Sequence, residues 1–273
     1  MSRPRCLGVL LCYNDGDLLE ESISYLLEQN HHLIAWDHGS TDETPVILER
    51  FRPHCREIRN VPREFDFYEL YPEMSRHLIA NYVKDYDWIS WPDQDEFLEG
   101  PARDRPYYEY VLEAHDSGID WIEFRNFNFW CTDENDPAIL ETTKRVRHYS
   151  LRPEGAPRIR SWRARATNIR HFNHNPLDGT PSPRLFNLRH YPMRSPEQMR
   201  ARVLRDRAEL RRGNLNFHYE NMTRRLDSLS IPASALHYDD GLSELDPEPI
   251  FDWRTIYGRS PEMVTEQGNR RLG

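Results

Sequence analysis

Short apolar segments alternate with amphipathic stretches along the first half of the sequence, and this alternation limits the possible folds more than any other feature. Residues 6–13 and 32–36 are continuous apolar runs followed by polar turns, as is typical of buried parallel strands. Residues 17–29 carry leucine and isoleucine near helical spacing, with acids in the first turn, and 43–51 are also predicted to be helical. The order β-α-β-α predicts a parallel sheet with right-handed crossovers.

The same alternation continues to residue 124. Further strands are predicted at 56–60, 88–91 and 121–124, and further helices at 69–86 and 107–115. From about residue 144 the sequence is rich in arginine and interrupted by proline, and only 195–212 has clear helical spacing. We therefore predict an α/β fold, with a Rossmann-like, mostly parallel sheet flanked by helices and an irregular C-terminal region.

No repeat or low-complexity linker divides the chain. We expect one domain over residues 1–240, made of an N-terminal half (1–125) and a C-terminal half (126–240), followed by a tail over 241–273. A chain of 273 residues is long enough to bury a core of this kind without disulfides or structural metal.

The composition excludes several classes of protein. With 30% charged residues and no apolar run near the roughly 18–20 residues that span a bilayer, the chain is not a polytopic membrane protein. A net charge of −9 argues against a general nucleic-acid binder. The four cysteines form no CxxC pair, which argues against a zinc ribbon and is consistent with a reducing cytosol. The N-terminus lacks the features of a signal peptide, so we expect a cytoplasmic protein.

The net charge conceals two tracts of opposite sign. Residues 144–225 contain 20 basic and 6 acidic residues, a balance of +14, so the rest of the chain carries −23. Nearly all the cations are arginine, whose planar fork suits phosphate and carboxylate groups. Most of these arginines are expected to be solvated or paired with acids.

Three predicted strands end in acid-bearing loops: Asn14-Asp15, residues 37–42, and residues 93–96. In a parallel sheet the carboxyl ends of the strands meet at one edge, where ligands bind in open α/β folds. We therefore expect these three loops to form one site.

Two of these loops have a plain structural interpretation beside a functional one. Asp93 and Asp95, two residues apart after a strand, can bind Mg²⁺ or Mn²⁺ through oxygen, or simply form an acidic turn. Glu96 adds charge to this loop or pairs with an arginine. In the other loop Ser40 or Thr41 would cap the next helix and Gly39 would permit a tight turn. Helix capping does not account for Asp37 at the end of the strand, where its carboxylate could contact a nucleobase or ribose.

These residues carry a family resemblance. Residues 37–44 (DHGSTDET) resemble the D-N-G-S-T-D-G-T segment of family 2 glycosyltransferases, with His38 and Glu43 as departures. Residues 88–98 (WISWPDQDEFL) resemble the strand that ends in their D-x-D metal motif. Residues 187–195 (NLRHYPMRS) resemble the H-Y-x-x-R/K-S segment of the bacterial branch that includes lipopolysaccharide-core-type enzymes. The match covers roughly residues 6–200.

The resemblance implies a GT-A fold, in which a nucleotide-binding half (1–125) is joined to an acceptor-binding half (126–240). It implies a UDP- or GDP-linked sugar as donor and a Mn²⁺ or Mg²⁺ ion. The ion would be held by Asp93 and Asp95, with His190 as candidate third ligand, and would neutralise the leaving diphosphate. The alternative for His190 is a purely structural role, as a hydrogen-bonded histidine beside a packed tyrosine.

The resemblance also suggests residues for the nucleotide. Asp37 would contact the base or ribose, in a loop that includes Gly39 and Asp42. Residues 12–15, including Cys12 and Asn14, would wall the pocket. Arg189 and Arg194 would hold phosphate oxygens bidentately.

The acceptor and the catalytic base are less defined. Other arginines of the basic tract are candidates to face an anionic acceptor. The aromatic run Phe127, Phe129 and Trp130 either stacks on sugars or packs in the core. By residue type, the base candidates are Glu96, Glu123, Asp178 and the pair Asp239-Asp240. Inversion follows from the family alone.

The sequence thus predicts a metal-dependent glycosyltransferase of the hexosyltransferase type. Its acceptor would be a glycan, a lipid-linked molecule or a small molecule with a hydroxyl group. No nucleic-acid partner and no transmembrane segment are expected, although peripheral membrane contact is compatible with the sequence. The alternatives are a nucleotidyltransferase that uses the same metal and nucleotide site, or a non-catalytic nucleotide- or sugar-binding module.

Overall fold

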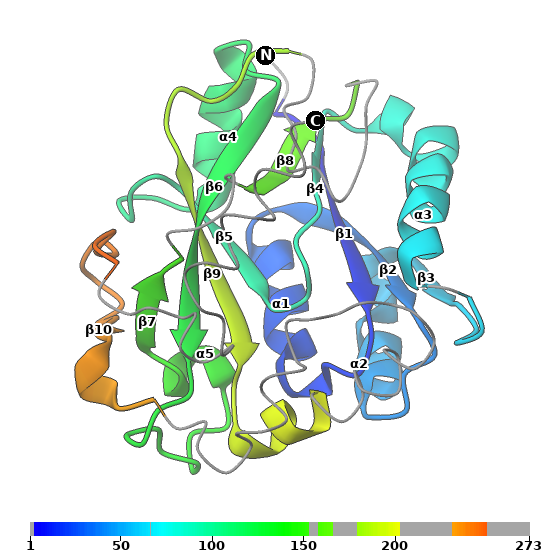
Figure 1. Cartoon of the computed structure of the whole chain (residues 1–273). Helices are drawn as coiled ribbons and strands as arrows, with labels where there is room; N and C mark the ends of the chain where they lie inside the picture. Colours follow the sequence, from blue (N-terminus) through cyan, green and yellow to red (C-terminus); the bar gives the residue numbers. More distant parts are fainter. Residues whose placement is uncertain (1–2, 66, 153–157, 166–178, 203–230, 250–273) are drawn as a thin grey trace, which may run out of the picture.

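One mixed sheet organises the chain (Figure 1). The computed structural model describes residues 3–65, 67–152, 158–165, 179–202 and 231–249. In these residues the strands follow the order β10-β7-β6-β8-β4-β1-β2-β3, with β9 paired to both β6 and β5. The strands are β1 (Cys6–Cys12), β2 (His31–Asp37), β3 (Cys55–Asn60), β4 (Trp88–Ser90), β5 (Glu96–Glu99), β6 (Trp121–Trp130), β7 (His148–Leu151), β8 (Arg158–Arg163), β9 (Phe186–Met193) and β10 (His237–Tyr238).

Helices flank this sheet. They are α1 (Gly16–Glu28), α2 (Thr44–Phe51), α3 (Phe67–Asn81), α4 (Tyr107–Asp116) and α5 (Thr142–Arg145), with the 3-10 turns η1 (Arg52–His54), η2 (Val83–Asp85) and η4 (Ala233–Ala235). Residues 196–202 are also helical, while the remainder of the helix predicted at 195–212 lies outside the described residues. Within the described part of the chain, no helix combines the length and apolar character needed to cross a membrane.

The N-terminal strands confirm the predicted parallel arrangement. β1 pairs in parallel with β2 on one side and β4 on the other, and β2 pairs in parallel with β3. Each crossover contains a helix, because the polar and apolar residues of 17–29, 43–51 and 69–81 alternate at helical spacing. The helix predicted at 69–86 ends earlier, at Asn81, and η2 follows before β4.

The C-terminal region is more regular than the sequence suggests. β8 lies antiparallel between β4 and β6, and β7 extends the pairing along the same side of β6. β6 itself runs to Trp130, beyond the predicted strand at 121–124, because Phe127 and Phe129 continue the buried pattern. β8 was not predicted from the sequence, because three of its six residues are arginines. Arginines are compatible with a buried strand only when carboxylates from elsewhere in the chain pair with them.

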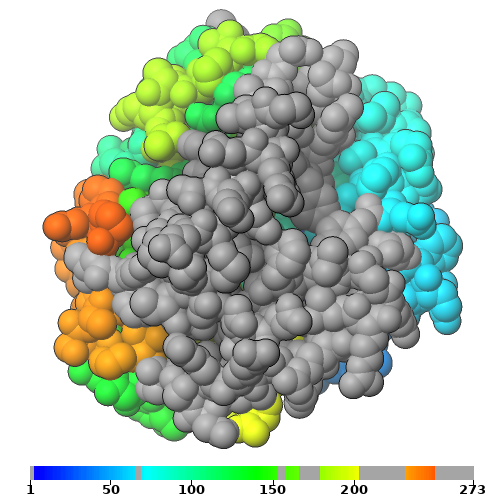
Figure 2. All heavy atoms as spheres, in the orientation of Figure 1, coloured from blue at the N-terminus to red at the C-terminus, as the bar shows by residue number. Residues whose placement is uncertain are grey.

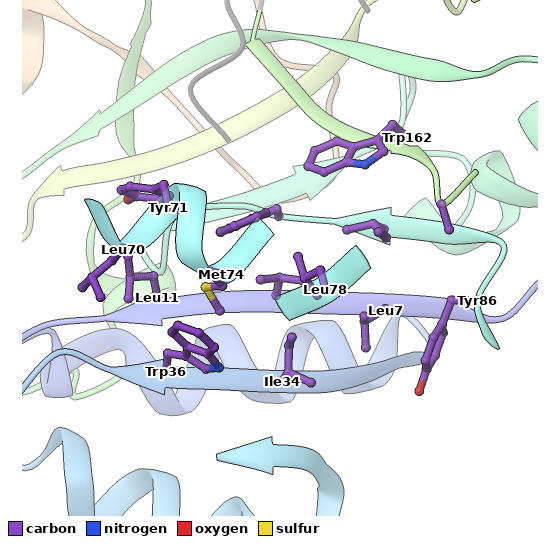
Figure 3. Close-up of a cluster of buried hydrophobic side chains, with 14 of the residues drawn as sticks. Leu7, Leu11, Ile34, Trp36, Leu70, Tyr71, Met74, Leu78, Tyr86 and Trp162 are labelled. Carbon is purple, nitrogen blue, oxygen red and sulfur yellow. The ribbon is translucent and has the colours of Figure 1, made fainter. Parts of the chain in front are cut away.

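α3 covers one face of the parallel strands. Figure 3 shows Met74 and Leu78 of α3 against Leu7 and Ile34 of β1 and β2, and none of these four side chains is exposed. Burying a side chain of this size contributes roughly 1.5–3 kcal/mol. In the space-filling view α3 and the β10 segment lie at opposite edges of the molecule (Figure 2).

Candidate functional site

The loops after β1 and β2 are joined by hydrogen bonds. Asn14, which has a positive φ of 51°, receives a hydrogen bond from the Thr41 N–H at 2.8 Å, and its own N–H donates to Ser40 Oγ at 3.0 Å. The Gly16 N–H donates to Asp42 Oδ2 at 2.9 Å. The two loops therefore form one continuous surface, as the parallel arrangement predicts.

The carboxylates of the β2 loop shape the loop itself. Asp37 is buried, and its Oδ1 accepts the Ser40 N–H at 3.2 Å. Asp42 Oδ1 accepts the Thr44 N–H at 3.0 Å, so Asp42 serves the first turn of α2 in place of the predicted caps Ser40 and Thr41. The reason is that α2 begins at Thr44, two residues beyond Asp42.

Gly39 and Cys12 support the same turn through the backbone. Gly39 has a φ of +62°, and a Cβ at this position would lie 3.2 Å from the backbone nitrogen of Arg63. The carbonyl of Cys12 accepts the His38 N–H at 2.9 Å. Burial raises the pKa of the Cys12 thiol well above its usual range, with Asp37 adding to the effect. The Cys12 thiol is therefore protonated and packed in the core, and it is the Cys12 backbone carbonyl that contacts the loop after β2.

The loop after β4 reaches the same edge. The Gln94 side-chain amide donates to Asp15, and the Gln94 carbonyl accepts the hydroxyl of Ser22 in α1. All three predicted acid-bearing loops are thus adjacent. This outcome confirms the sequence prediction that they share one edge of the sheet.

Asp93 and Glu96 are bound to arginines of β8. Arg160 Nη2 lies 3.1 Å from Asp93 Oδ2, and Arg160 Nε lies 2.5 Å from Glu96 Oε2. Arg158 also pairs with Glu96. The Asp93 N–H donates a hydrogen bond to Glu96 Oε2 at 3.0 Å. The side chain of Glu96 is fully buried. Of the two roles predicted for Glu96 in this loop, pairing with an arginine is the one observed.

Asp95 and His190 are neighbours because β9 pairs antiparallel with β5. This register sets His190 opposite Glu96, and the Tyr191 N–H donates to the Asp95 carbonyl at 2.8 Å. His190 Nε2 lies 3.5 Å from Asp95 Oδ2. His190 Nδ1 lies 2.8 Å from Oδ1 of Asn128 in β6. His190 is therefore held by a partner on the side of the ring that faces away from Asp95.

Three nitrogen-bearing side chains surround the Asp95 carboxylate. Besides His190, Arg202 Nη1 lies 3.2 Å and Arg194 Nη1 lies 3.8 Å from Asp95 Oδ2. Burial works to raise the pKa of Asp95, but these neighbours outweigh it and hold the pKa well below its usual range. Asp95 is consequently ionised at neutral pH.

Arg194 ties the segment after β9 to the loop after β1. Its side chain has no exposed surface, and its guanidinium lies 2.6 Å from Asp15 and 2.7 Å from Asp17. Burial works to lower the pKa of Arg194, but Asp15 and Asp17 outweigh it and raise the pKa. Its nitrogens are therefore committed to carboxylates, and the phosphate role predicted for Arg194 stays a prediction.

A cleft of about 940 Å³ lies beside these loops. Its walls come from the loops after β1 and β2, from the segment after β6 and from the segment after β9. The lining residues are Asn14, Gly16, Asp17, Asp42, Glu43, Cys131, Thr132, Asn135, Pro137, Arg145, Arg194, Ser195, Pro196, Glu197, Gln198, Ala201 and Arg202.

Other candidates lie elsewhere. Arg189 is in a separate cleft of about 460 Å³, where it pairs with Glu99 at 3.4 Å and Asp239 at 3.2 Å. Phe127, Phe129 and Trp130 are buried, so they pack in the core rather than offering a sugar platform. Asp178 lies outside the described residues.

The remaining base candidates differ in environment. Burial raises the pKa of Glu123 in β6. Asp240 is exposed and its Oδ1 accepts the N–H groups of Leu242 and Ser243, which lowers its pKa, with the Ser243 hydroxyl contributing most. Among the described residues, no group of three or more histidine, cysteine, aspartate or glutamate side chains is gathered closely enough to form a complete metal cluster.

Several residues of the site carry no local signal in the sequence. Arg160, Arg202 and Asn128 reach the D-x-D loop or His190 from other strands or from the helix at 196–202. The clustering of arginine after residue 144 was the only available indication. It did not show which arginines would meet the acidic loops.

No protein-family model matches the chain, and no curated protein matches it. Among solved structures, the chain is similar to the mannosyltransferase PcManGT from Pyrobaculum calidifontis in complex with GDP-Man and Mn²⁺, with 19% identity and a TM-score of 0.32 over 51% of this chain and 38% of that chain. It is also similar to S. aureus TarS 1-349 in complex with UDP, with 13% identity and a TM-score of 0.42 over 73% of this chain and 64% of that chain. The matches thus cover less than two thirds of each of these two solved chains.

Proposed function

We propose that this chain is a metal-dependent glycosyltransferase of the hexosyltransferase type, which transfers a sugar from a nucleotide-sugar donor to a hydroxyl acceptor with inversion. One observation carries the proposal: the acid-bearing loops after β1, β2 and β4 meet at one sheet edge, and those after β1 and β2 line a cleft of about 940 Å³. Ligands of open α/β sheets bind at this edge. The resemblance of residues 37–44, 88–98 and 187–195 to family 2 glycosyltransferases supports the same function.

The nucleoside would lie against the joined loops after β1 and β2. Cys12 and Asp37 are the last residues of β1 and β2, and Asn14, Gly39 and Asp42 lie in the loops that follow. The hydrogen bonds between the loops support a rigid, preformed surface. Asp37 is the carboxylate proposed to meet the base or ribose. Either a uridine or a guanosine donor is compatible with this assignment.

Asp93, Asp95 and His190 would hold Mn²⁺ or Mg²⁺. The residues fit a divalent cation in one respect: the Asp95 oxygen and the His190 nitrogen are side by side, and both are common metal ligands. Arg160 holds the Asp93 carboxylate, and we assign it the role of orienting that carboxylate. When bound, the metal would supply Lewis-acid stabilisation of the leaving diphosphate.

The hydrogen-bond and ion-pair partners of Glu96, Arg189 and Arg194 limit the roles of these residues. Glu96 has its oxygens engaged by two arginines and a backbone N–H, which supports a positioning role rather than that of a base. We propose Asp178 as the base, with Glu123 and the pair Asp239-Asp240 as alternatives. A phosphate could reach Arg189 or Arg194 only by replacing the carboxylates that these arginines already bind.

The acceptor is proposed only by class. It would be a glycan, a lipid-linked molecule or a small molecule with a hydroxyl group, and the basic tract over residues 144–225 favours an anionic one. A cytoplasmic location, with or without peripheral membrane contact, is part of the same proposal.

A panel of UDP- and GDP-linked sugars, each with and without Mn²⁺, tests the function. The correct donor should raise the melting temperature, because stabilisation reaches about 2.7 kcal/mol at 100 Kd of ligand. Release of nucleoside diphosphate should then depend on Mn²⁺ and fall at least 100-fold in Asp95→Asn. Asp116→Asn, at the exposed end of α4, is the matched control and should keep full activity.

Two outcomes would contradict the proposal. Full turnover in EDTA together with an active Asp95→Asn variant would remove the metal mechanism. Binding of a nucleotide sugar without any release of nucleoside diphosphate, even with acceptors supplied, would indicate a non-catalytic module.

A further inference from the structure

Positive charge gathers in the cleft of about 460 Å³ that contains Arg189. Sites for small molecules have volumes of roughly 300–1,000 Å³, so this cleft is of ligand size. Among its described lining residues, the cations are Arg103, Arg105, Lys144, Arg147 and Arg189, and the carboxylates are those of Glu99 and Asp239. The lining thus holds five cations and two carboxylates.

Two of the arginines account for both carboxylates. Arg103 Nη1 lies 2.6 Å from Asp239 Oδ1, and Arg103 Nε lies 3.2 Å from Glu99 Oε2. Arg189 lies 3.4 Å from Glu99 and 3.2 Å from Asp239. These four side chains balance one another in charge. The other three cations are therefore not neutralised by any carboxylate of the lining.

Arg147, between α5 and β7, differs from the other cations of the cleft. Arg105 and Lys144 pair with glutamates outside the lining. The Arg147 guanidinium lies 4.9 Å from the centre of the Tyr238 ring. Within the described ranges, no carboxylate lies at ion-pair distance from it and no group accepts a hydrogen bond from it. The donors of a half-buried arginine are thus available to a ligand.

The turn after β10 leaves room beside this guanidinium. Gly241 also lines the cleft and has a φ of +77°, and a Cβ at this position would lie 3.4 Å from Arg147 Nη2. The Asp239 N–H donates to the Arg147 carbonyl at 2.8 Å, and the Gly241 N–H donates to Asp239 Oδ1 at 2.8 Å. The turn is therefore held against Arg147 by its backbone, and it places no side chain next to Nη2.

This cleft is distinct from the candidate nucleotide site. The two clefts have no described lining residue in common. Arg189 and His190 are consecutive in β9, and consecutive side chains of a strand point to opposite faces of the sheet. Arg189 lines this cleft, whereas His190 lies beside Asp95. A ligand here would not occupy the space of the nucleotide.

We propose that this cleft is a second ligand site, which binds a phosphate monoester through Arg147. A phosphate monoester carries a charge of about −1.5 to −2 at pH 7, and its oxygens accept paired hydrogen bonds from the arginine fork. The excess of cations in the lining favours this charge over that of a single carboxylate. Soluble phosphate esters and lipid headgroups share this chemistry. The site does not depend on the proposed transferase activity.

The test measures the dissociation constant of glycerol 3-phosphate for the full chain by isothermal titration calorimetry. Arg147→Gln should bind it at least about tenfold more weakly, because a hydrogen bond to a charged group contributes at least the 1.4 kcal/mol that correspond to this factor. Arg76→Gln is the matched control and should leave the affinity unchanged. It removes an arginine from α3, at the opposite edge of the molecule from the β10 segment (Figure 2).

A conservative variant and a second anion define the chemistry. Arg147→Lys keeps the charge but loses the planar fork, so its affinity should lie between those of the wild type and Arg147→Gln. Lactate, which carries one negative charge on a carboxylate, should bind the wild type more weakly than glycerol 3-phosphate. Equal affinities for the two anions would overturn the assignment to a phosphate monoester.

Co-sedimentation with phosphatidylcholine vesicles, with and without phosphatidic acid, separates the two sources of the phosphate. Binding that requires phosphatidic acid and is weakened in Arg147→Gln assigns the site to a lipid headgroup. Binding of the soluble ester alone assigns it to a soluble molecule. If the wild type binds neither form, or if Arg147→Gln binds as tightly as the wild type, the inference is wrong.

Discussion

His31 makes the stability of this protein depend on pH at the end of the sheet away from the candidate site. The side chain is buried, its Nδ1 lies 2.9 Å from the Gln29 carbonyl, and its Nε2 lies 2.9 Å from Ser90 Oγ in β4. Burial lowers the pKa of His31 from its ordinary value of 6.5 to about 4, and the hydrogen bond to Gln29 only partly opposes the effect. The fold therefore requires the neutral imidazole.

The sign and size of the effect follow from this shift. Because the pKa is lower in the folded than in the unfolded protein, the stabilisation is complete above about pH 6.5 and is lost as the pH falls toward about 4. A shift of this size corresponds to roughly 3 kcal/mol at the acid limit, at 1.36 kcal/mol per pKa unit. By about pH 4.5 the expected loss is already about 2.5 kcal/mol.

Urea unfolding followed by tryptophan fluorescence, at several values between about pH 7.5 and about pH 4.5, measures this loss. Carboxylates also titrate in the lower part of that range, so the free energy of unfolding is compared with that of His31→Gln, which cannot take up a proton. The difference in free energy between wild type and variant should shrink by about 2.5 kcal/mol on acidification. A difference that stays constant over this range would refute the assignment of a buried, neutral His31.

Two further predictions concern the loops of the site. Gly39→Ala should destabilise the protein by more than Gly118→Ala: both have a positive φ and cost roughly 1–2 kcal/mol for that reason, but only at Gly39 does a Cβ meet backbone, at 3.2 Å. Equal losses in urea unfolding would contradict this. Arg194→Met should cost roughly 3–5 kcal/mol, because it leaves the buried Asp15 carboxylate and the exposed Asp17 carboxylate without the arginine they share, and adding Asp15→Asn and Asp17→Asn should restore part of this loss. If the triple variant were less stable than Arg194→Met, the assigned pairing would be wrong.

The sequence predicted the parallel half of the fold well. Strands β1, β2, β3 and β4 and the helices between them were identified within a few residues. The signal was local: apolar runs of strand length and amphipathic stretches of helical length do not depend on distant partners. Once the strands are parallel, their acid-bearing ends must share an edge, and the structure confirms this.

The C-terminal half was harder to predict because its strands are polar. β8 carries Arg158, Arg160 and Arg163, and β9 carries Arg189 and His190. Hydrophobic periodicity cannot identify such strands, since the charges become buried only when partners from elsewhere in the chain pair with them. β9 is also the strand that brings His190 to Asp95.

By itself, then, the sequence determined the order of strands and helices, the common edge of the acidic loops, and the excess of arginine after residue 144. Only the tertiary structure decided which arginine meets which acid. Arg194 binds Asp17 across 177 positions of sequence, and Arg160 binds Asp93 across 67. Ion pairs form between side chains that the fold brings within a few ångströms, and the spacing of residues along the chain does not encode that proximity.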